Sequence, residues 1–372
     1  GCFVEDEVKQ LVGAGHEVEV FAAGAAGTDP VRREGALTVW RVQPPACAGR
    51  PLFYGEGAPE ALERAGLPAL SAWAQAAWFW GGLCRALRRR VGHLERLVAH
   101  WLVPSAAVAL AVAPHLPLRA HAHSGDVALL ERWPGGRAMA RWLARRSAAA
   151  NSATNATELL FVTRALRQRF AALVGRPVGR VQTLAAPSEL FAPANPGSRQ
   201  AARRRLGLAR PTVISVGRLV PIKGFDLLLT ACANVARAQA AGPASPPSLD
   251  LDLVILGDGP QRQSLDQRAR RLGVRLTLPG FVPRPQVADW LRAADVYVQP
   301  SLDLPSGRTE GLPLAVLEAL AMGLRVVASQ VGGLPELAHQ NHGINLVPPG
   351  DVAALGRALD RLLGGRPTGT PL

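Results

Sequence analysis

Two glutamates in the stretch "RTEGLPLAVLEALAMG" (308–323) have a spacing that suits chemistry at the start of a helix. Glu310 and Glu318 are separated by seven residues, and Gly-Leu-Pro follows the first of them. Because proline suits the first helical turn, the pattern predicts a helix over 312–322 with Glu310 just before it. Free N–H groups at such a helix start can bind phosphate, and the two carboxylates would accept hydrogen bonds from hydroxyl groups. The spacing also fits an acid stabilised by the helix dipole and a second, solvated glutamate.

Two cations, Arg218 and Lys223, lie five residues apart in "SVGRLVPIKG" (215–224), directly after a predicted strand that turns on Gly217. Arginine offers a planar fork of donors and lysine a point charge, so together they suit a diphosphate. The stretch is not a Walker loop, which needs a different glycine spacing. A pair of solvated surface cations is the alternative. A functional role is favoured because this chain, with 42 basic residues, has only one other lysine.

The elements that must position these residues alternate along the whole chain as short apolar runs and helical patterns. This alternation predicts an α/β protein with two doubly wound, largely parallel sheets. Ligands of such sheets bind beyond the carboxyl ends of the strands, where both groups above are found. We predict domains at 1–186 and 187–372, with the linker and a first helix over 187–205. The predicted strands span 17–23, 36–42, 96–101, 118–123, 158–162, 181–185, 212–217, 251–257, 275–280, 295–301, 325–330 and 344–349.

Composition limits the class of protein and its surroundings. Hydrophobic residues make up 48% of the chain and charged residues 19%, which excludes a disordered protein. The net charge of +14 favours acidic partners such as phosphates or anionic lipid headgroups. The four cysteines form no C-x-x-C, so they indicate neither a zinc site nor a disulfide framework and fit a reducing cytoplasm. The charge-free stretch 66–84 predicts a buried or interfacial helix rather than one that spans a membrane.

A set of motifs in the second half carries a family resemblance. In order, the chain has G-R-x₄-K-G, G-D-G-P, P-S, E-G-x-P-x₄-E-A and G-G-x-P-E. The set resembles the retaining glycosyltransferases of family 4, or glycosyl transferases group 1. These have the GT-B fold, in which two Rossmann-like domains face a central cleft. The first half agrees through "GHEVEVFA" (15–22), "AHWLVPS" (99–105), "HAHSGDV" (121–127) and "FVTRALRQRF" (161–170).

The resemblance implies a function for the chain. It implies transfer of a sugar from a nucleoside diphosphate donor to an acceptor hydroxyl, with retention of anomeric configuration and without a metal or other cofactor. The acceptor could be a glycan, a lipid or a small molecule. A cytoplasmic location and a part in building cell-envelope polysaccharides follow from the same resemblance. Front-face substitution, in which the leaving phosphate takes the acceptor's proton, is the mechanism that it suggests.

Roles carry over by position. The resemblance implies that Arg218 and Lys223 hold the donor diphosphate, that Glu310 contacts the transferred sugar, and that Glu318 binds the ribose. His123 would reach the sugar from the first domain. The implied catalytic residues are therefore Glu310, His123, Arg218 and Lys223. The implied donor-binding residues, which include backbone around the base and the phosphates, are Gly217, Arg218, Lys223, Phe281, Val282, Glu310, Gly311, Leu312, Pro313, Leu314 and Glu318.

His123 has two further interpretations. His121 and His123 alternate along a predicted strand and share a face, and H-x-H can bind a metal. No third ligand is apparent in the sequence, so we predict no metal site. A histidine with a structural role only is the second alternative.

Two departures and two other functions stay open. The family's first strand with its glycine loop, and its last helix that crosses back to the first domain, are expected to be missing here, so the chain could be a weakly active fragment. A sugar-nucleotide epimerase on the same fold is the alternative enzyme. Basic charge alone could instead serve binding, and no nucleic-acid motif accompanies it. Residues 73–80 and 85–90 predict peripheral contact with an anionic membrane.

Overall fold

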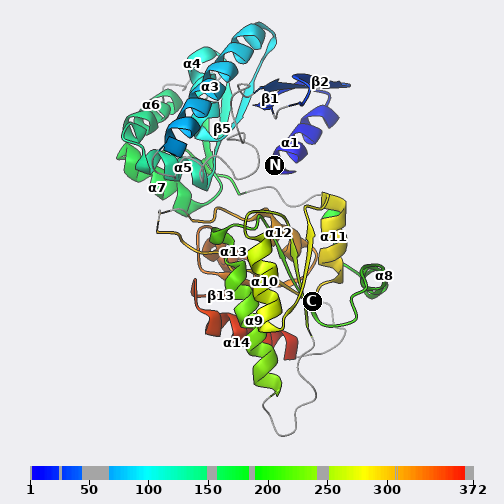
Figure 1. The fold of residues 1–372 in the computed structure, drawn as a ribbon. Coiled ribbons are helices and arrows are strands. Elements are labelled where there is room, and N and C mark those ends of the chain that lie inside the picture. Colours follow the sequence, from blue (N-terminus) through cyan, green and yellow to red (C-terminus); the bar gives the residue numbers. More distant parts are fainter. Residues whose placement is uncertain are drawn as a thin grey trace. The chain divides into compact units, whose positions relative to one another are not determined.

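The structure is a computed structural model, and it describes residues 2–24, 27–43, 67–148, 157–183, 189–240, 251–305, 307 and 309–364. The chain forms two compact units, residues 1–184 and 185–372 (Figure 1). The predicted boundary between residues 186 and 187 falls outside the described residues, as does the loop predicted over 241–249.

The described residues of the first unit form two sheets. Strands β4-β5-β6-β7 are all parallel, whereas β1 and β3 are parallel and β2 pairs with β3 in the antiparallel direction. The sequence did not predict β2, because its residues "VRRE" are all exposed and carry no apolar pattern. The elements are α1 (Cys2–Gly13), β1 (Val18–Ala23), β2 (Val31–Glu34), β3 (Leu37–Val42), α3 (Leu67–Arg90), η1 (Val91–His93), β4 (Leu97–His100), η2 (Leu102–Ala106), α4 (Ala107–Val112), β5 (Leu118–Ala122), α5 (Ser124–Arg132), α6 (Gly136–Ala148), β6 (Thr157–Phe161), α7 (Arg164–Val174) and β7 (Arg180–Val181).

The second unit is built on one sheet of six parallel strands in the order β10-β9-β8-β11-β12-β13. Numbered within the unit this is 3-2-1-4-5-6, the Rossmann order, and the strand order reverses between β8 and β11. Its elements are η3 (Glu189–Phe191), α8 (Pro196–Leu206), β8 (Thr212–Val216), η4 (Pro221–Lys223), α9 (Phe225–Ala240), β9 (Asp252–Leu256), α10 (Arg262–Leu272), β10 (Arg275–Gly280), α11 (Arg284–Ala293), β11 (Val296–Gln299), α12 (Leu314–Ala321), β12 (Arg325–Ser329), α13 (Leu334–Gln340), β13 (Ile344–Val347) and α14 (Val352–Gly364).

The core of the second unit fixes which way the strand residues face. On one side of the sheet, apolar residues of α9, α10 and α14 pack against Val213, Val296 and Val298. Each fully buried aliphatic side chain of this kind contributes about 1.5–3 kcal/mol. Because side chains alternate along a strand, Ile214 and Tyr297 face the opposite side, toward α11 and α12.

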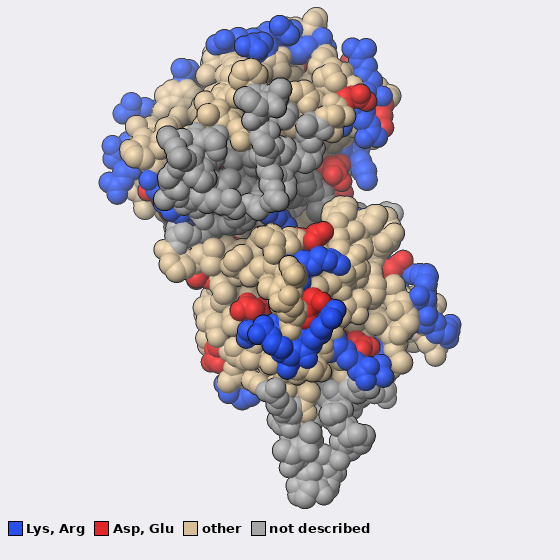
Figure 2. All heavy atoms as spheres, in the orientation of Figure 1, with Lys and Arg blue, Asp and Glu red and all other residues tan. Residues whose placement is uncertain are grey.

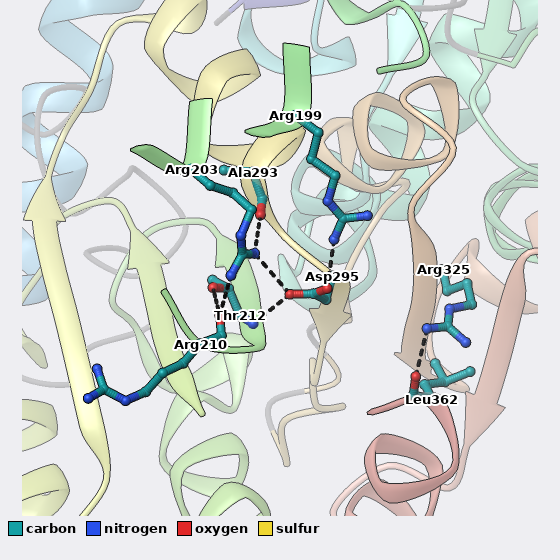
Figure 3. Close-up of polar contacts among 8 residues, drawn as sticks. All are labelled: Arg199, Arg203, Arg210, Thr212, Ala293, Asp295, Arg325 and Leu362. Carbon is teal, nitrogen blue, oxygen red and sulfur yellow. Dashed lines mark hydrogen bonds and ion pairs between the residues drawn. The ribbon is translucent and has the colours of Figure 1, made fainter. Parts of the chain in front are cut away.

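Ion pairs and hydrogen bonds stabilise the amino end of the same sheet (Figure 3). Asp295, just before β11, accepts from Arg199 and Arg203 of α8 at 2.6 and 3.1 Å and from the Thr212 backbone N–H at 2.8 Å. Arg203 also donates to the Ala293 carbonyl at 2.8 Å. These contacts join α8 to the amino ends of β8 and β11, at the edge of the sheet opposite the predicted site.

Candidate functional site

The loops that follow β8, β9 and β11 are in direct backbone contact. A Cβ on Gly224, which has φ of +63°, would lie 2.0 Å from the Pro300 carbonyl oxygen. A Cβ on Gly257 would lie 1.9 Å from the Gly217 carbonyl oxygen. No other residue fits at either position without moving backbone. The two glycines therefore let the loops at the carboxyl ends of β8, β9 and β11 pack directly against one another, next to the point where the strand order reverses.

Lys223 and Glu310 meet at this edge. Lys223 Nζ donates to Glu310 Oε2 at 2.6 Å, and each side chain is only 16% exposed. Ser301 Oγ lies 3.0 Å from the same carboxylate oxygen. The sequence predicts both residues in one site but assigns them separate ligands, and it does not predict that they pair with each other. The pair places an ammonium, suited to phosphate, beside a carboxylate that is suited to hydroxyl groups.

Glu318 lies on α12 and is 5% exposed. Its Oε1 accepts from Arg284 Nε at 3.0 Å, and the Arg284 guanidinium lies 5.1 Å from the centre of the Phe191 ring. A buried carboxylate needs such a cation, because desolvation without a partner would be costly. No sequence motif named above predicts Arg284 as part of the site. The available signal was its position, because it follows the predicted base-binding residues Phe281 and Val282 almost directly.

The helix start differs slightly from its prediction. Helix α12 spans Leu314–Ala321 rather than 312–322, and Pro313 precedes it with φ −67° and ψ 117°. The fixed φ of proline suits the helix, but the extended ψ keeps Pro313 outside it. Proline has no N–H, so any backbone phosphate cradle here is formed by Gly311, Leu312 and Leu314 without Pro313. The loop is braced by Gly333, whose N–H donates to the Gly311 carbonyl at 3.0 Å.

The remaining predicted donor-binding residues lie along the same edge. The Gly217 N–H donates to the Leu256 carbonyl at 2.9 Å, so a backbone hydrogen bond to β9 holds Gly217 directly after the end of β8. Arg218 is half-buried beside it, and Val282 is half-buried after β10. Phe281 is 84% exposed, which makes its ring available for stacking. The roles assigned to all these residues stay predictions.

In the first unit, His123 belongs to a histidine cluster at the ends of β4 and β5. The rings of His100 and His121 stack with centroids 4.9 Å apart, and His123 lies 5.8 Å from His100. His100 Nε2 lies 3.0 Å from Glu7 Oε2 on α1. Burial lowers the pKa of His123 to about 3, so this ring is neutral at physiological pH. The predicted contact of His123 with the transferred sugar stays a prediction.

Asp126 explains how the "HSGD" stretch is held. Its carboxylate, wholly buried at the start of α5, accepts from the backbone N–H groups of Leu102, His123 and Val127 at 2.6, 2.9 and 2.8 Å. Burial raises the pKa of Asp126 to about 7. Asp126 therefore orients the backbone on both sides of the histidine cluster, a role that the sequence alone did not predict.

Among the residues that the structure describes, no group of three or more histidine, cysteine, aspartate or glutamate side chains could hold a metal ion. The predicted independence from metals stays a prediction. The same described residues include no helix that is long and apolar enough to cross a bilayer, and α3 covers most of the stretch predicted to be buried or interfacial.

Comparisons with known proteins report similarity to glycosyltransferases. Residues 210–364 match the model of the family described as Glycosyl transferases group 1. The chain is 33% identical over 224 residues to a GDP-mannose-dependent alpha-(1-6)-phosphatidylinositol monomannoside mannosyltransferase of Mycolicibacterium smegmatis, covering 59% of this chain and 56% of the relative. It is 32% identical over 187 residues to a putative colanic acid biosynthesis glycosyltransferase, WcaL, of Escherichia coli, covering 49% and 44%. The chain thus spans about half the length of the curated relatives it matches.

Solved structures show the fold. Sucrose-phosphate synthase from Thermosynechococcus elongatus superposes with a TM-score of 0.65 at 22% identity, covering 96% of this chain and 84% of that one. WaaG, a glycosyltransferase involved in lipopolysaccharide biosynthesis, gives 0.65 at 17% identity, covering 98% and 87%. The predicted α/β fold of the GT-B type, with its Rossmann-like units, is confirmed, and so is the resemblance to glycosyl transferases group 1.

Proposed function

We propose that this chain, whose residues 210–364 match the glycosyl transferases group 1 model, transfers a sugar from a nucleoside diphosphate donor to an acceptor hydroxyl. One observation carries the proposal. Lys223 and Glu310, far apart in sequence, pair at 2.6 Å beside the strand reversal of a Rossmann-ordered sheet, where ligands of such sheets bind. The names of the relatives favour sugar transfer over the epimerisation that the sequence left open.

In the proposed reaction, negative charge develops on the diphosphate as its bond to the sugar breaks. Lys223, Arg218 and the backbone N–H groups at the start of α12 would stabilise that charge, and preorganised groups of this kind often supply the largest share of catalysis. Glu310 would hold the hydroxyl groups of the sugar, and Glu318 those of the ribose. Phe281 and Val282 would receive the base.

We also propose that the anomeric configuration is retained. Retention often uses a carboxylate nucleophile, which must be able to approach the anomeric carbon. Here Glu310 is tied to Lys223 and Ser301, and Glu318 is buried against Arg284. This supports front-face substitution, in which the leaving phosphate itself takes the proton of the acceptor hydroxyl, over attack by either carboxylate.

The experiment measures release of nucleoside diphosphate from GDP-mannose and UDP-glucose, first without an added acceptor and then with candidate acceptors. GDP-mannose comes first because the Mycolicibacterium relative is named for it. Lys223→Met and Glu310→Gln should each lower turnover by about 100-fold or more, as loss of a transition-state contact does. Lys9→Met, a change at the other lysine of the chain, is the matched control and should turn over at the wild-type rate. Wild-type turnover in Lys223→Met would refute the assignment.

An anionic membrane surface is the partner that we propose for the first unit. Helices α3 and α6 contain no acidic residue, and Figure 2 shows basic side chains along the edges of the visible face of this unit. Trp73 and Trp78 on α3 are 40% and 54% exposed. The exposed arginines of the two helices are Arg85, Arg88 and Arg89 on α3, and Arg137, Arg141, Arg145 and Arg146 on α6. Exposed tryptophan beside arginine suits the interface of anionic lipids.

Sedimentation with phosphatidylglycerol vesicles tests this surface. We expect binding at low ionic strength that is weakened by salt, is absent with phosphatidylcholine, and is lost in the variant Trp78→Ser/Arg85→Ser/Arg88→Ser. The matched control Arg270→Ser/Arg271→Ser removes two arginines from α10 of the second unit and should bind normally. If the α3 variant bound vesicles as well as the wild type does, the contact would lie elsewhere on the protein. If the wild type did not bind, the proposed membrane contact would be refuted.

A further inference from the structure

Three polar residues follow one another at alternate positions of β11 and just beyond its end. Tyr297, Gln299 and Ser301 are each wholly buried. They face away from Val296 and Val298, which belong to the apolar core under α9 and α14. Polar side chains buried at consecutive positions on one face of a central strand are costly unless every group is hydrogen-bonded, and apolar residues would fill the space equally well.

The three side chains form a continuous chain of hydrogen bonds that ends at Glu310. Tyr297 Oη lies 2.7 Å from Gln299 Oε1, and Gln299 Nε2 lies 2.7 Å from Ser301 Oγ. Ser301 Oγ lies 3.0 Å from Glu310 Oε2, the oxygen that also accepts from Lys223. Every link joins a donor to an acceptor.

The direction of this chain follows from its two ends. A carboxylate only accepts, so Ser301 must give its single proton to Glu310. The oxygen of Ser301 must then accept from the Gln299 amide NH₂, which turns Gln299 Oε1 toward the Tyr297 hydroxyl. The reverse direction would set the lone pairs of Ser301 against the carboxylate. The chain therefore fixes the orientation of the Gln299 amide and presents a donor to Glu310.

We propose that Tyr297, Gln299 and Ser301 are positioning residues that hold the Glu310 carboxylate in the orientation needed to bind the sugar of the donor. The proposal rests on the proposed function, because it assigns the sugar to Glu310. Ser301 and Lys223, which lie in different loops, both donate to Glu310 Oε2. These two hydrogen bonds restrict rotation of the carboxylate about the last side-chain torsion angle of Glu310. The P-S motif after β11 thereby takes a part in recognising the sugar, separate from the diphosphate.

The experiment separates sugar recognition from nucleotide recognition. The dissociation constants of GDP-mannose and GDP, and of UDP-glucose and UDP, are measured by calorimetry, and the pair that binds the wild type is used. In Ser301→Ala, the dissociation constant of the sugar nucleotide divided by that of the nucleotide alone should rise about tenfold. A tenfold weakening is the effect expected for the loss of one hydrogen bond to a charged group. Tyr297→Phe removes only the hydroxyl at the far end of the chain and should raise the same ratio about threefold. Because this change is small, the variant should fold and keep the test available even if Ser301→Ala is unfolded.

Ser215→Ala is the matched control. Ser215 is equally buried on the neighbouring strand β8, but its hydroxyl donates to the Val298 carbonyl at 2.5 Å rather than toward Glu310. Its ratio should equal that of the wild type even if its stability falls. An unchanged ratio in both Ser301→Ala and Tyr297→Phe would overturn the proposal and leave the proposed function intact. A wild type that binds none of the four nucleotides would refute the proposed function and this inference together.

Discussion

Replacing Arg284 by methionine should destabilise the second unit through Glu318 rather than through lost packing. Glu318 is 5% exposed and Arg284, 19% exposed on its side chain, contacts its Oε1 through Nε and Nη2 at 3.0 Å. Two unit charges about 4 Å apart attract by about 4 kcal/mol at an effective dielectric constant of about 20. Removing one partner of a buried pair costs about 3–5 kcal/mol, because the other charge stays buried. We expect a loss of about 3 kcal/mol, near the lower limit because Arg284 keeps some contact with solvent.

A double-mutant cycle isolates this term. The free energy of unfolding in urea is measured for the wild type, Arg284→Met, Glu318→Gln and the double variant. The double variant leaves no buried charge, so its loss of unfolding free energy should be smaller than the sum of the losses in the two single variants. The difference, the coupling energy, should be about 2 kcal/mol. The control is Arg292→Met on the same helix, whose pair with Asp289 is more exposed, and it should cost less than about 1 kcal/mol. Additive losses in the cycle would show that Arg284 does not stabilise the buried charge of Glu318.

Three further predictions concern other parts of the molecule. Asp295→Ala should lower the stability of the second unit by about 2–4 kcal/mol in urea unfolding, since it removes two ion pairs and the acceptor of the Thr212 N–H; a loss below about 0.5 kcal/mol would contradict it. The pKa of Asp126 is raised from 3.8 to about 7, so its contribution to stability is complete below about pH 4 and is lost as the pH rises to 7. The stability of the wild type relative to Asp126→Asn should therefore fall across that range, and a flat difference would contradict the assignment. Finally, EDTA should leave nucleoside diphosphate release unchanged, because the proposed charge stabilisation uses Lys223 and Arg218; loss of activity that Mg²⁺ restores would show that a metal takes part.

Much of the fold could be predicted because the signals are local. Apolar runs such as 251–257 and 325–330 have the length and content of strands buried on both faces, and Gly257 at the end of the first run marks where two loops approach closely. Strand β2 could not be found this way, because its four residues are exposed, three of them are charged, and the strand is defined only by pairing with β3.

The site was predictable in its members but not in its contacts. Glu310 and Lys223 stand in recognisable motifs, yet their pairing depends on β8 and β11 being neighbours, which no linear spacing reveals. Arg284 and Gln299 were missed for the same reason, since each acts through a residue that is distant in sequence or hidden on a strand face. The start of the predicted helix was placed at residue 312 rather than at Leu314. The error arose because the fixed φ of Pro313 suits both the first helical residue and the residue before it.

The main-chain contacts of Gly224 and Gly257 have a consequence for engineering the protein. The loops at the carboxyl edge are joined by backbone atoms, so their frame does not depend on which side chains they carry. A library that varies exposed or half-buried positions such as Phe281 and Val282, and keeps both glycines, should therefore yield folded variants in which the proposed base-binding role of these two residues can be tested. Changes at the glycines should instead be recovered only as insoluble protein.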